Sequence, residues 1–136
     1  METTGDLLMS AARSLRREYA AATVAWAMTP GKARALRFVA AEGPVRLSVL
    51  ADMLGIVPRS TTEVVDALET LGYVAREADP VDRRATCVAA TDEGRRVLAE
   101  IEVARAEASE RYFADLPQAD RAELERILTA LAGVRA

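Results

Sequence analysis

Two short groups of polar and basic side chains have the chemistry needed to bind an anion. The first group is Arg59, Ser60, Thr61, Thr62 and Glu63. The second group lies in a polar turn and is Asp82, Arg83 and Arg84. Arginine and hydroxyl side chains donate hydrogen bonds to phosphate oxygens and base edges, so both groups suit nucleic acid. An acid such as Asp82 can also orient a neighbouring guanidinium through a charge-assisted hydrogen bond.

The residues used in most enzymatic chemistry are missing. The 136 residues include no histidine and a single cysteine, Cys87. A His-based triad, a His-ligated zinc site and a disulfide within one chain are therefore excluded. Asp79 and Asp82 are near enough in sequence to share a divalent cation, but the adjacent arginines favour ion pairing. We expect no enzymatic activity, no metal site and no cofactor, and we expect Cys87 to be a small buried side chain.

Composition predicts one soluble globular domain, with 51% hydrophobic and 29% charged residues. The net charge is −3, and residues 29–90 are balanced in charge. An anion-binding surface must therefore come from the local placement of arginines. The N-terminal segment lacks the order of a secretory signal, and no run is apolar enough to span a bilayer. We expect a cytoplasmic protein with no membrane partner.

Hydrophobic periodicity predicts a mainly helical chain. The expected helices cover residues 4–25, 30–42, 49–54, 58–71, 92–113 and 118–132. Thr29, Ser48 and Thr91 are the expected N-caps, and Gly55 is expected to end helix 49–54 in the left-handed conformation.

Helix 58–71 has two alternative starts. Pro58 can occupy the first helical position, or Ser60 and Glu63 can form a capping box. The tight turn at Gly55 between two helices predicts a helix-turn-helix, helped by the small side chain of Ala51. A short extended segment covers residues 45–47.

Residues 73–77 and 85–90 predict two strands, joined by a polar turn that carries Arg83 and Arg84. The order of elements predicts a winged helix-turn-helix, which is a three-helix core with a β-hairpin wing, extended by N- and C-terminal helices. Apolar stripes on the terminal helices exceed what this core can cover, so we expect a homodimer. Its two recognition helices would read a pseudo-palindrome with half-sites roughly 10 base pairs apart.

The run LSVLADMLGIVPRSTTEVVDALETLGYVAREADPVDRRATCVAATDEG resembles the corresponding region of MarR-type transcriptional regulators. The DPVDRR wing, followed by a Thr-x-x-Gly helix start, is the most specific part. The resemblance covers essentially the whole chain and implies a single domain, residues 1–136. Within it, residues 1–28 and 92–136 would be dimerisation helices, and residues 29–91 the DNA-binding lobe.

The family resemblance also implies a function and its site residues. It implies a homodimeric repressor of operator DNA that is often released by a small lipophilic or phenolic ligand. The residues from Arg59 to Thr62 would face the major groove, and Asp82, Arg83 and Arg84 would form the wing contact. A ligand pocket is implied between the terminal helices and the lobe, and its candidate lining residues, which are otherwise core residues, are Tyr19, Trp26 and Met28.

The chain departs from the family at Glu63 and Ala67, where basic residues are common. Fewer phosphate contacts and weaker or more selective DNA binding are expected from this difference. Together with the balanced charge of residues 29–90, these positions favour one alternative function. The alternative is a winged-helix module that binds another protein and has little or no specific affinity for DNA.

Overall fold

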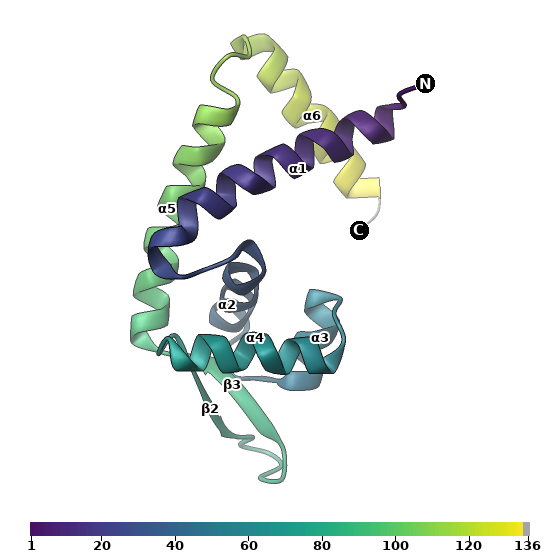
Figure 1. Cartoon of the computed structure of the whole chain (residues 1–136). Helices are drawn as coiled ribbons and strands as arrows, with labels where there is room; N and C mark the ends of the chain where they lie inside the picture. Colours follow the sequence, from purple (N-terminus) through teal and green to yellow (C-terminus); the bar gives the residue numbers. More distant parts are fainter. Residues whose placement is uncertain (135–136) are drawn as a thin grey trace.

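The computed structural model describes residues 1–134, which form a compact lobe beneath a longer helical arm (Figure 1). In chain order the elements are α1 (Thr4–Thr23), the 3-10 turn η1 (Val24–Trp26), α2 (Pro30–Glu42), β1 (Val45–Arg46), α3 (Leu47–Leu54), α4 (Pro58–Thr70), β2 (Val74–Ala78), β3 (Thr86–Ala90), α5 (Asp92–Tyr112) and α6 (Gln118–Val134). We call α2 to β3 the lobe, and α1, α5 and α6 the arm. The predicted mainly α fold with a β-hairpin wing is confirmed.

The arm is built from helices at both ends of the chain. In Figure 1, α1 crosses α5, and α6 turns back from the top of α5 toward α1. The Tyr112 hydroxyl on α5 donates to the carbonyl of Ala11 on α1 at 3.3 Å. No helix among residues 1–134 has the length and apolar character that a bilayer crossing requires.

The wing belongs to a three-stranded antiparallel sheet in the order β1-β3-β2. Val45 of β1 pairs with Val88 of β3, and Val74 of β2 pairs with Ala90 of β3. The extended segment before α3 was predicted, but its pairing with the wing was not. This pairing attaches the base of the hairpin to the start of the helix-turn-helix.

One hydrophobic core joins the lobe to the arm. Its fully buried large side chains come from α2, α3, α4, β3 and α5, with Leu36, Leu50, Leu68, Val88 and Ile101 as examples. Burial of such side chains is worth roughly 1.5–3 kcal/mol each relative to exposure. The lobe is therefore packed directly on the first half of α5.

Local side chains fix the starts of α2 and α5 as expected. The Thr29 hydroxyl accepts from Lys32 N–H at 3.2 Å, and the Thr91 hydroxyl accepts from Gly94 N–H at 3.0 Å. The expectation that Ser48 caps α3 is wrong, because the helix begins at Leu47, two residues earlier than predicted. The pairing of β1 with β3 brings the chain into α3 at that point.

Candidate nucleic-acid interface

The turn between α3 and α4 positions the N-terminal end of α4. Gly55 has φ of 67°, in the left-handed region, and its N–H donates to Asp52 O at 3.2 Å. A side chain would be strained in this conformation, which accounts for the glycine. α4 begins at Pro58, and the alternative start at a Ser60 and Glu63 capping box is not used. The residues predicted to contact bases therefore lie in the first two turns of α4.

The exposed face of α4 carries most of the predicted base-contacting residues. Arg59, Thr62 and Glu63 are exposed, with 92% of the Arg59 side chain and 72% of the Glu63 side chain accessible. Ser60 is half-buried. Arg59 Nε lies 4.0 Å from a carboxylate oxygen of Glu63, one helical turn away. This face therefore presents donors and an acceptor side by side.

Thr61 does not belong to this face. It is 1% exposed, and its hydroxyl donates to the carbonyl of Val57 at 3.2 Å. Thr61, Val65 and Leu68 are four and three residues apart, so they lie on the same face of α4, and all three are buried. The prediction that Thr61 faces the major groove is therefore wrong, since its side chain packs into the lobe.

The wing tip exposes two arginines. Arg83 and Arg84 are both exposed, and neither guanidinium forms an ion pair within residues 1–134. The Asp82 carboxylate accepts from the backbone N–H of Arg84 at 3.1 Å. Asp82 therefore shapes the backbone of the turn, and the expectation that it orients a guanidinium is wrong.

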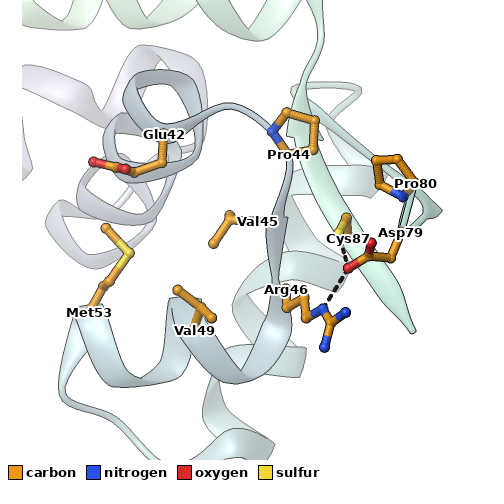
Figure 2. Close-up of a pocket in the computed structure, with 9 residues that line it drawn as sticks. All are labelled: Glu42, Pro44, Val45, Arg46, Val49, Met53, Asp79, Pro80 and Cys87. Atoms are coloured by element: carbon orange, nitrogen blue, oxygen red, sulfur yellow. Dashed lines mark hydrogen bonds and ion pairs between the residues drawn. The ribbon is translucent and has the colours of Figure 1, made fainter. Parts of the chain in front are cut away.

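The base of the wing is held by Asp79, which is 7% exposed (Figure 2). Arg46 Nε on β1 donates to Asp79 Oδ2 at 2.5 Å. The other oxygen accepts from Val81 N–H at 2.7 Å and Asp82 N–H at 3.2 Å. The hydrogen bond from Arg46 and then those from the backbone lower the pKa of Asp79 to about 2. Asp79 is therefore a carboxylate at neutral pH and ties the turn of the wing to Arg46 on β1.

Cys87 lies beside this pair, on the wall of a cavity of about 500 Å³ (Figure 2). The thiol is 3.6 Å from Asp79 Oδ2, and Cys87 is buried as expected. Burial, followed by the nearby charge of Asp79, raises the pKa of the Cys87 thiol. The cysteine is therefore a poor nucleophile in the folded protein.

A second ion-pair cluster ties the wing to α4. Arg76 on β2 donates to Asp66 at 2.6 Å and to Glu69 at 2.7 Å. Both acids lie on the exposed side of α4, and Arg76 offsets their charge. Because the same side chain reaches two points on α4, it fixes the helix relative to the hairpin.

A cavity of about 310 Å³ lies between the arm and the lobe, and four arginines are on its wall. Its lining residues are Ala12, Leu15, Arg16, Tyr19, Pro30, Arg34, Arg37 and Arg105. The Arg105 guanidinium lies 4.5 Å from the centre of the Tyr19 ring. Of the three predicted lining residues, Tyr19 lines this cavity, whereas Trp26 and Met28 do not.

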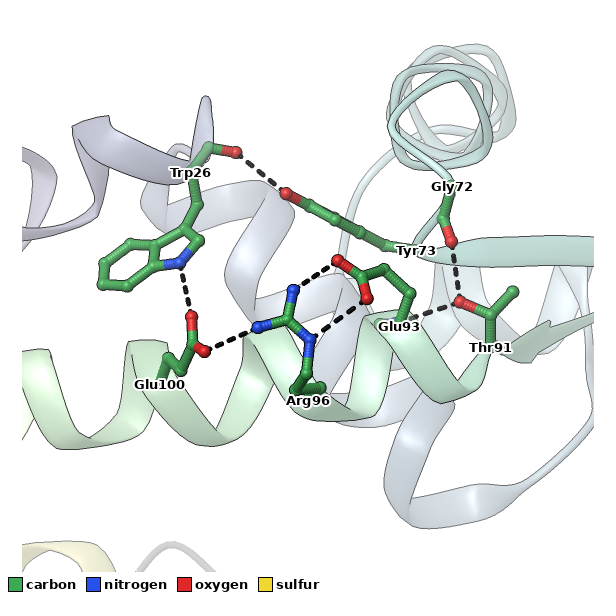
Figure 3. A network of polar contacts seen from close by, with 8 residues as sticks. Trp26, Gly72, Tyr73, Thr91, Glu93, Arg96 and Glu100 are labelled. Carbon is green, nitrogen blue, oxygen red and sulfur yellow. Dashed lines mark hydrogen bonds and ion pairs between the residues drawn. The ribbon is translucent and has the colours of Figure 1, made fainter.

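Trp26 and Met28 have structural positions instead. Met28 is a core residue that is 3% exposed. The Trp26 indole donates to Glu100 on α5 at 2.9 Å, and its carbonyl accepts from the Tyr73 hydroxyl at 3.4 Å (Figure 3). Arg96 bridges Glu100 to an acid two turns earlier on α5. This network joins the link between α1 and α2 to the arm and the lobe.

Comparison with known proteins agrees with this geometry. The sequence model of the MarR family matches residues 28–85. A protein of Thauera aromatica named "Putative transcriptional regulatory protein for hcr operon" is 33% identical over 104 residues, which cover 76% of this chain and 63% of that protein. The chain is thus similar in sequence to MarR-family regulators. It spans less than two thirds of the length of that relative.

Solved structures of similar proteins share the fold. CouR bound to a 23-mer DNA duplex is 26% identical with a TM-score of 0.86, covering 99% of this chain and 94% of CouR. CouR from Rhodococcus jostii RHA1 bound to p-coumaroyl-CoA is 29% identical with a TM-score of 0.75, covering 94% and 90%. A MarR-family protein of Mycobacterium tuberculosis in complex with p-aminosalicylic acid is 26% identical with a TM-score of 0.79, covering 96% and 98%.

The sequence alone does not predict the side chains that position the candidate interface. Arg46, Asp79 and Arg76 brace the wing, and Arg37 on α2 holds Glu102 on α5 at 2.7 Å. Only Asp79 carries a local signal, because an aspartate at the start of a polar turn often accepts backbone N–H groups two or three residues on.

Proposed function

We propose that this protein is a transcriptional regulator of the MarR type that binds operator DNA as a homodimer and acts as a repressor. The observation that carries the proposal is the pair of exposed surfaces on the first turns of α4 and at the wing tip. A recognition helix reads bases in the major groove, and arginine is attracted to the adjacent narrow minor groove. In Figure 1 the hairpin projects beyond α4 on the side away from the arm, as such a contact requires.

A second copy of the chain is the proposed partner of the arm. Large apolar side chains are exposed on α1 and α6, namely Leu7, Leu8, Met9, Ile127, Leu128 and Leu131. Exposed apolar side chains in this number mark an interaction surface. A two-fold dimer through residues 1–28 and 92–136 buries them and leaves two lobes, residues 29–91, facing DNA. The operator is then pseudo-palindromic, with half-sites roughly 10 base pairs apart.

The cavity between the arm and the lobe is the proposed effector site. An aromatic side chain, apolar side chains and four arginines favour a small aromatic ligand with an acidic group. The two relatives with bound small molecules support an effector of this kind. A carboxylate in the cavity competes with Glu102 for Arg37, which joins α2 to α5, and for Arg105, which lies 3.4 Å from Glu102.

The cavity is also linked to the helix-turn-helix. Arg34, on the cavity wall, donates to the carbonyls of Leu54 at 2.9 Å and Met53 at 3.3 Å, at the end of α3. A ligand that moves α2 relative to α5 therefore shifts the end of α3 and the turn before α4. This coupling accounts for release of DNA on ligand binding.

Selection from a library of random duplexes at two salt concentrations tests the function. We expect enrichment of a pseudo-palindrome and a steep fall in affinity with salt. Replacing Arg84 by Ala should weaken DNA binding. It should also reduce the steepness of the plot of log affinity against log salt concentration by about one for each lobe. Arg13→Ala, which removes the same charge from α1, should leave the slope unchanged.

The main alternative predicts a different result. Three acids on the exposed side of α4, Glu63, Asp66 and Glu69, favour a module that binds a protein. No enriched sequence, together with negligible binding at low salt, supports that alternative and contradicts the proposal.

A further inference from the structure

We propose that Glu63 and Arg59 act together to read cytosine and guanine in each operator half-site. This inference rests on the proposed DNA-binding function and adds the identity of the bases. Glu63 accepts a hydrogen bond from the N4 amino group of a cytosine, and Arg59 donates two hydrogen bonds to the O6 and N7 of a guanine. The two bases lie in the same base pair or in adjacent pairs.

The first observation is that α4 holds its three exposed acids in different ways. Asp66 and Glu69 are bound to Arg76 at 2.6 and 2.7 Å, so their charges are offset within the lobe. The Glu63 carboxylate accepts no hydrogen bond within residues 1–134, and the cation that lies near it is Arg59, at 4.0 Å. The structure therefore neutralises the acids on the later turns and leaves Glu63 available near the N-terminal end.

The second step is electrostatic. A carboxylate that enters a groove between two rows of phosphates is repelled unless a donor meets it. Cytosine offers an amino group in the major groove, whereas adenine presents its amino group next to the N7 acceptor. A carboxylate that accepts from the adenine amino group lies beside the lone pair of N7 and is repelled by it. Cytosine is therefore the better partner for Glu63.

The third step is the spacing of the two side chains. Glu63 follows Arg59 by one helical turn, which puts the two side chains on the same side of α4 at about 5–6 Å between Cβ atoms. Stacked base pairs are about 3.4 Å apart. Arg59 and Glu63 can therefore contact the same base pair or two adjacent base pairs. When DNA binds, Arg59 leaves its weak contact with Glu63 and donates to guanine instead.

The test compares the base preferences of the wild-type protein, Glu63→Gln and Asp52→Asn. Asp52 is an exposed acid on α3, so its replacement controls for the loss of one negative charge. The selected duplex is measured alongside duplexes in which each position is changed in turn. Wild type should lose about 5- to 100-fold in affinity when the cytosine is replaced. Glu63→Gln should bind all duplexes more tightly and shift its preference at this position from cytosine toward adenine, whose N6 and N7 a glutamine can bind together. Asp52→Asn should keep the preference for cytosine.

The outcomes separate this inference from the proposed function. If wild type enriches a sequence but Glu63→Gln keeps the same preference at every position, Glu63 only repels DNA and the inference is overturned. The inference is also overturned if Glu63→Gln changes the base preference only at positions where the preferred site has no cytosine. If wild type enriches no sequence at all, the proposed function fails first. Thermal unfolding of each variant confirms that the fold is intact.

Discussion

Arg46 and Asp79 form an ion pair at 2.5 Å that joins the strand before the helix-turn-helix to the base of the wing. Arg46 lies on β1, and Asp79 directly follows β2. These two strands lie on opposite sides of β3. Asp79 also binds two backbone N–H groups of the turn. The pair therefore sets where Arg83 and Arg84 point, although neither Arg46 nor Asp79 is in the exposed groups predicted to touch DNA.

Replacing Asp79 by Asn should destabilise the protein in a pH-dependent way. The pKa of Asp79 is about 2 in the folded protein, against an ordinary value of 3.8. A carboxyl whose pKa is lowered on folding stabilises the fold above its unfolded pKa, and this contribution is lost as the pH falls through the folded pKa. The Tm difference between wild type and Asp79→Asn should be full above about pH 4 and shrink toward pH 2. Equal differences at pH 7 and pH 2 contradict this assignment, and Asp115→Asn serves as the control.

The sequence predicted those features that neighbouring residues determine. Thr29, Thr91 and Gly55 fix helix ends through bonds to groups within a few residues, so their types alone were informative. The contacts of Arg46 with Asp79 and of Trp26 with Glu100 join residues 33 and 74 positions apart. No local pattern specifies such partners.

Thr61 was mispredicted for a different reason. Its polar type suggested exposure, but its spacing from Val65 and Leu68 places it on the buried face of α4. A threonine can be buried in a helix because its hydroxyl donates to the carbonyl four residues earlier, as it does here to Val57. Periodicity was the better signal than residue type.

Replacing Gly94 by Ala should destabilise the fold, although alanine normally favours helices. A Cβ at Gly94 would overlap the backbone of Tyr73, which cannot move away easily because its carbonyl accepts from Thr91 N–H. We expect a loss of about 1–3 kcal/mol in the free energy of unfolding. The control is Gly133→Ala, because a Cβ at Gly133 would have no atom within 4 Å. This variant should be more stable than wild type by about 0.5–1 kcal/mol. Chemical denaturation measures both, and a stabilised Gly94→Ala contradicts the packing described.

Replacing Leu131 by Glu should prevent dimerisation. Leu131 is 51% exposed on α6, and a carboxylate cannot be buried there without a partner. Light scattering should give twice the chain mass of 14.7 kDa for wild type and a single chain for the variant. Val81→Glu makes the same kind of change at the wing turn and should remain dimeric. A monomeric wild type contradicts the proposed dimer.

Replacing Glu102 by Gln should strengthen binding of a small acid in the cavity. The change removes the carboxylate that holds Arg37 and lies near Arg105, leaving both for the ligand. Titration calorimetry with benzoate should show about two- to fivefold tighter binding, given that the pair is partly exposed. Benzamide, which is neutral, should bind weakly to both proteins. Glu107→Gln on the same helix is the matched control, and equal binding of benzoate and benzamide to wild type contradicts an acidic effector.

The crossing of α1 over α5 has a consequence for the order in which the molecule folds. The hydrogen bond from Tyr112 to Ala11 joins residues 101 positions apart, with the whole lobe between them. During synthesis α1 emerges before α5, the helix on which most of its packing lies, because the whole lobe comes between them in the chain. Closing so long a loop is costly unless the intervening chain is already compact. We therefore expect the lobe to fold before α1 docks on α5, which leaves the apolar face of α1 exposed on the nascent chain until then.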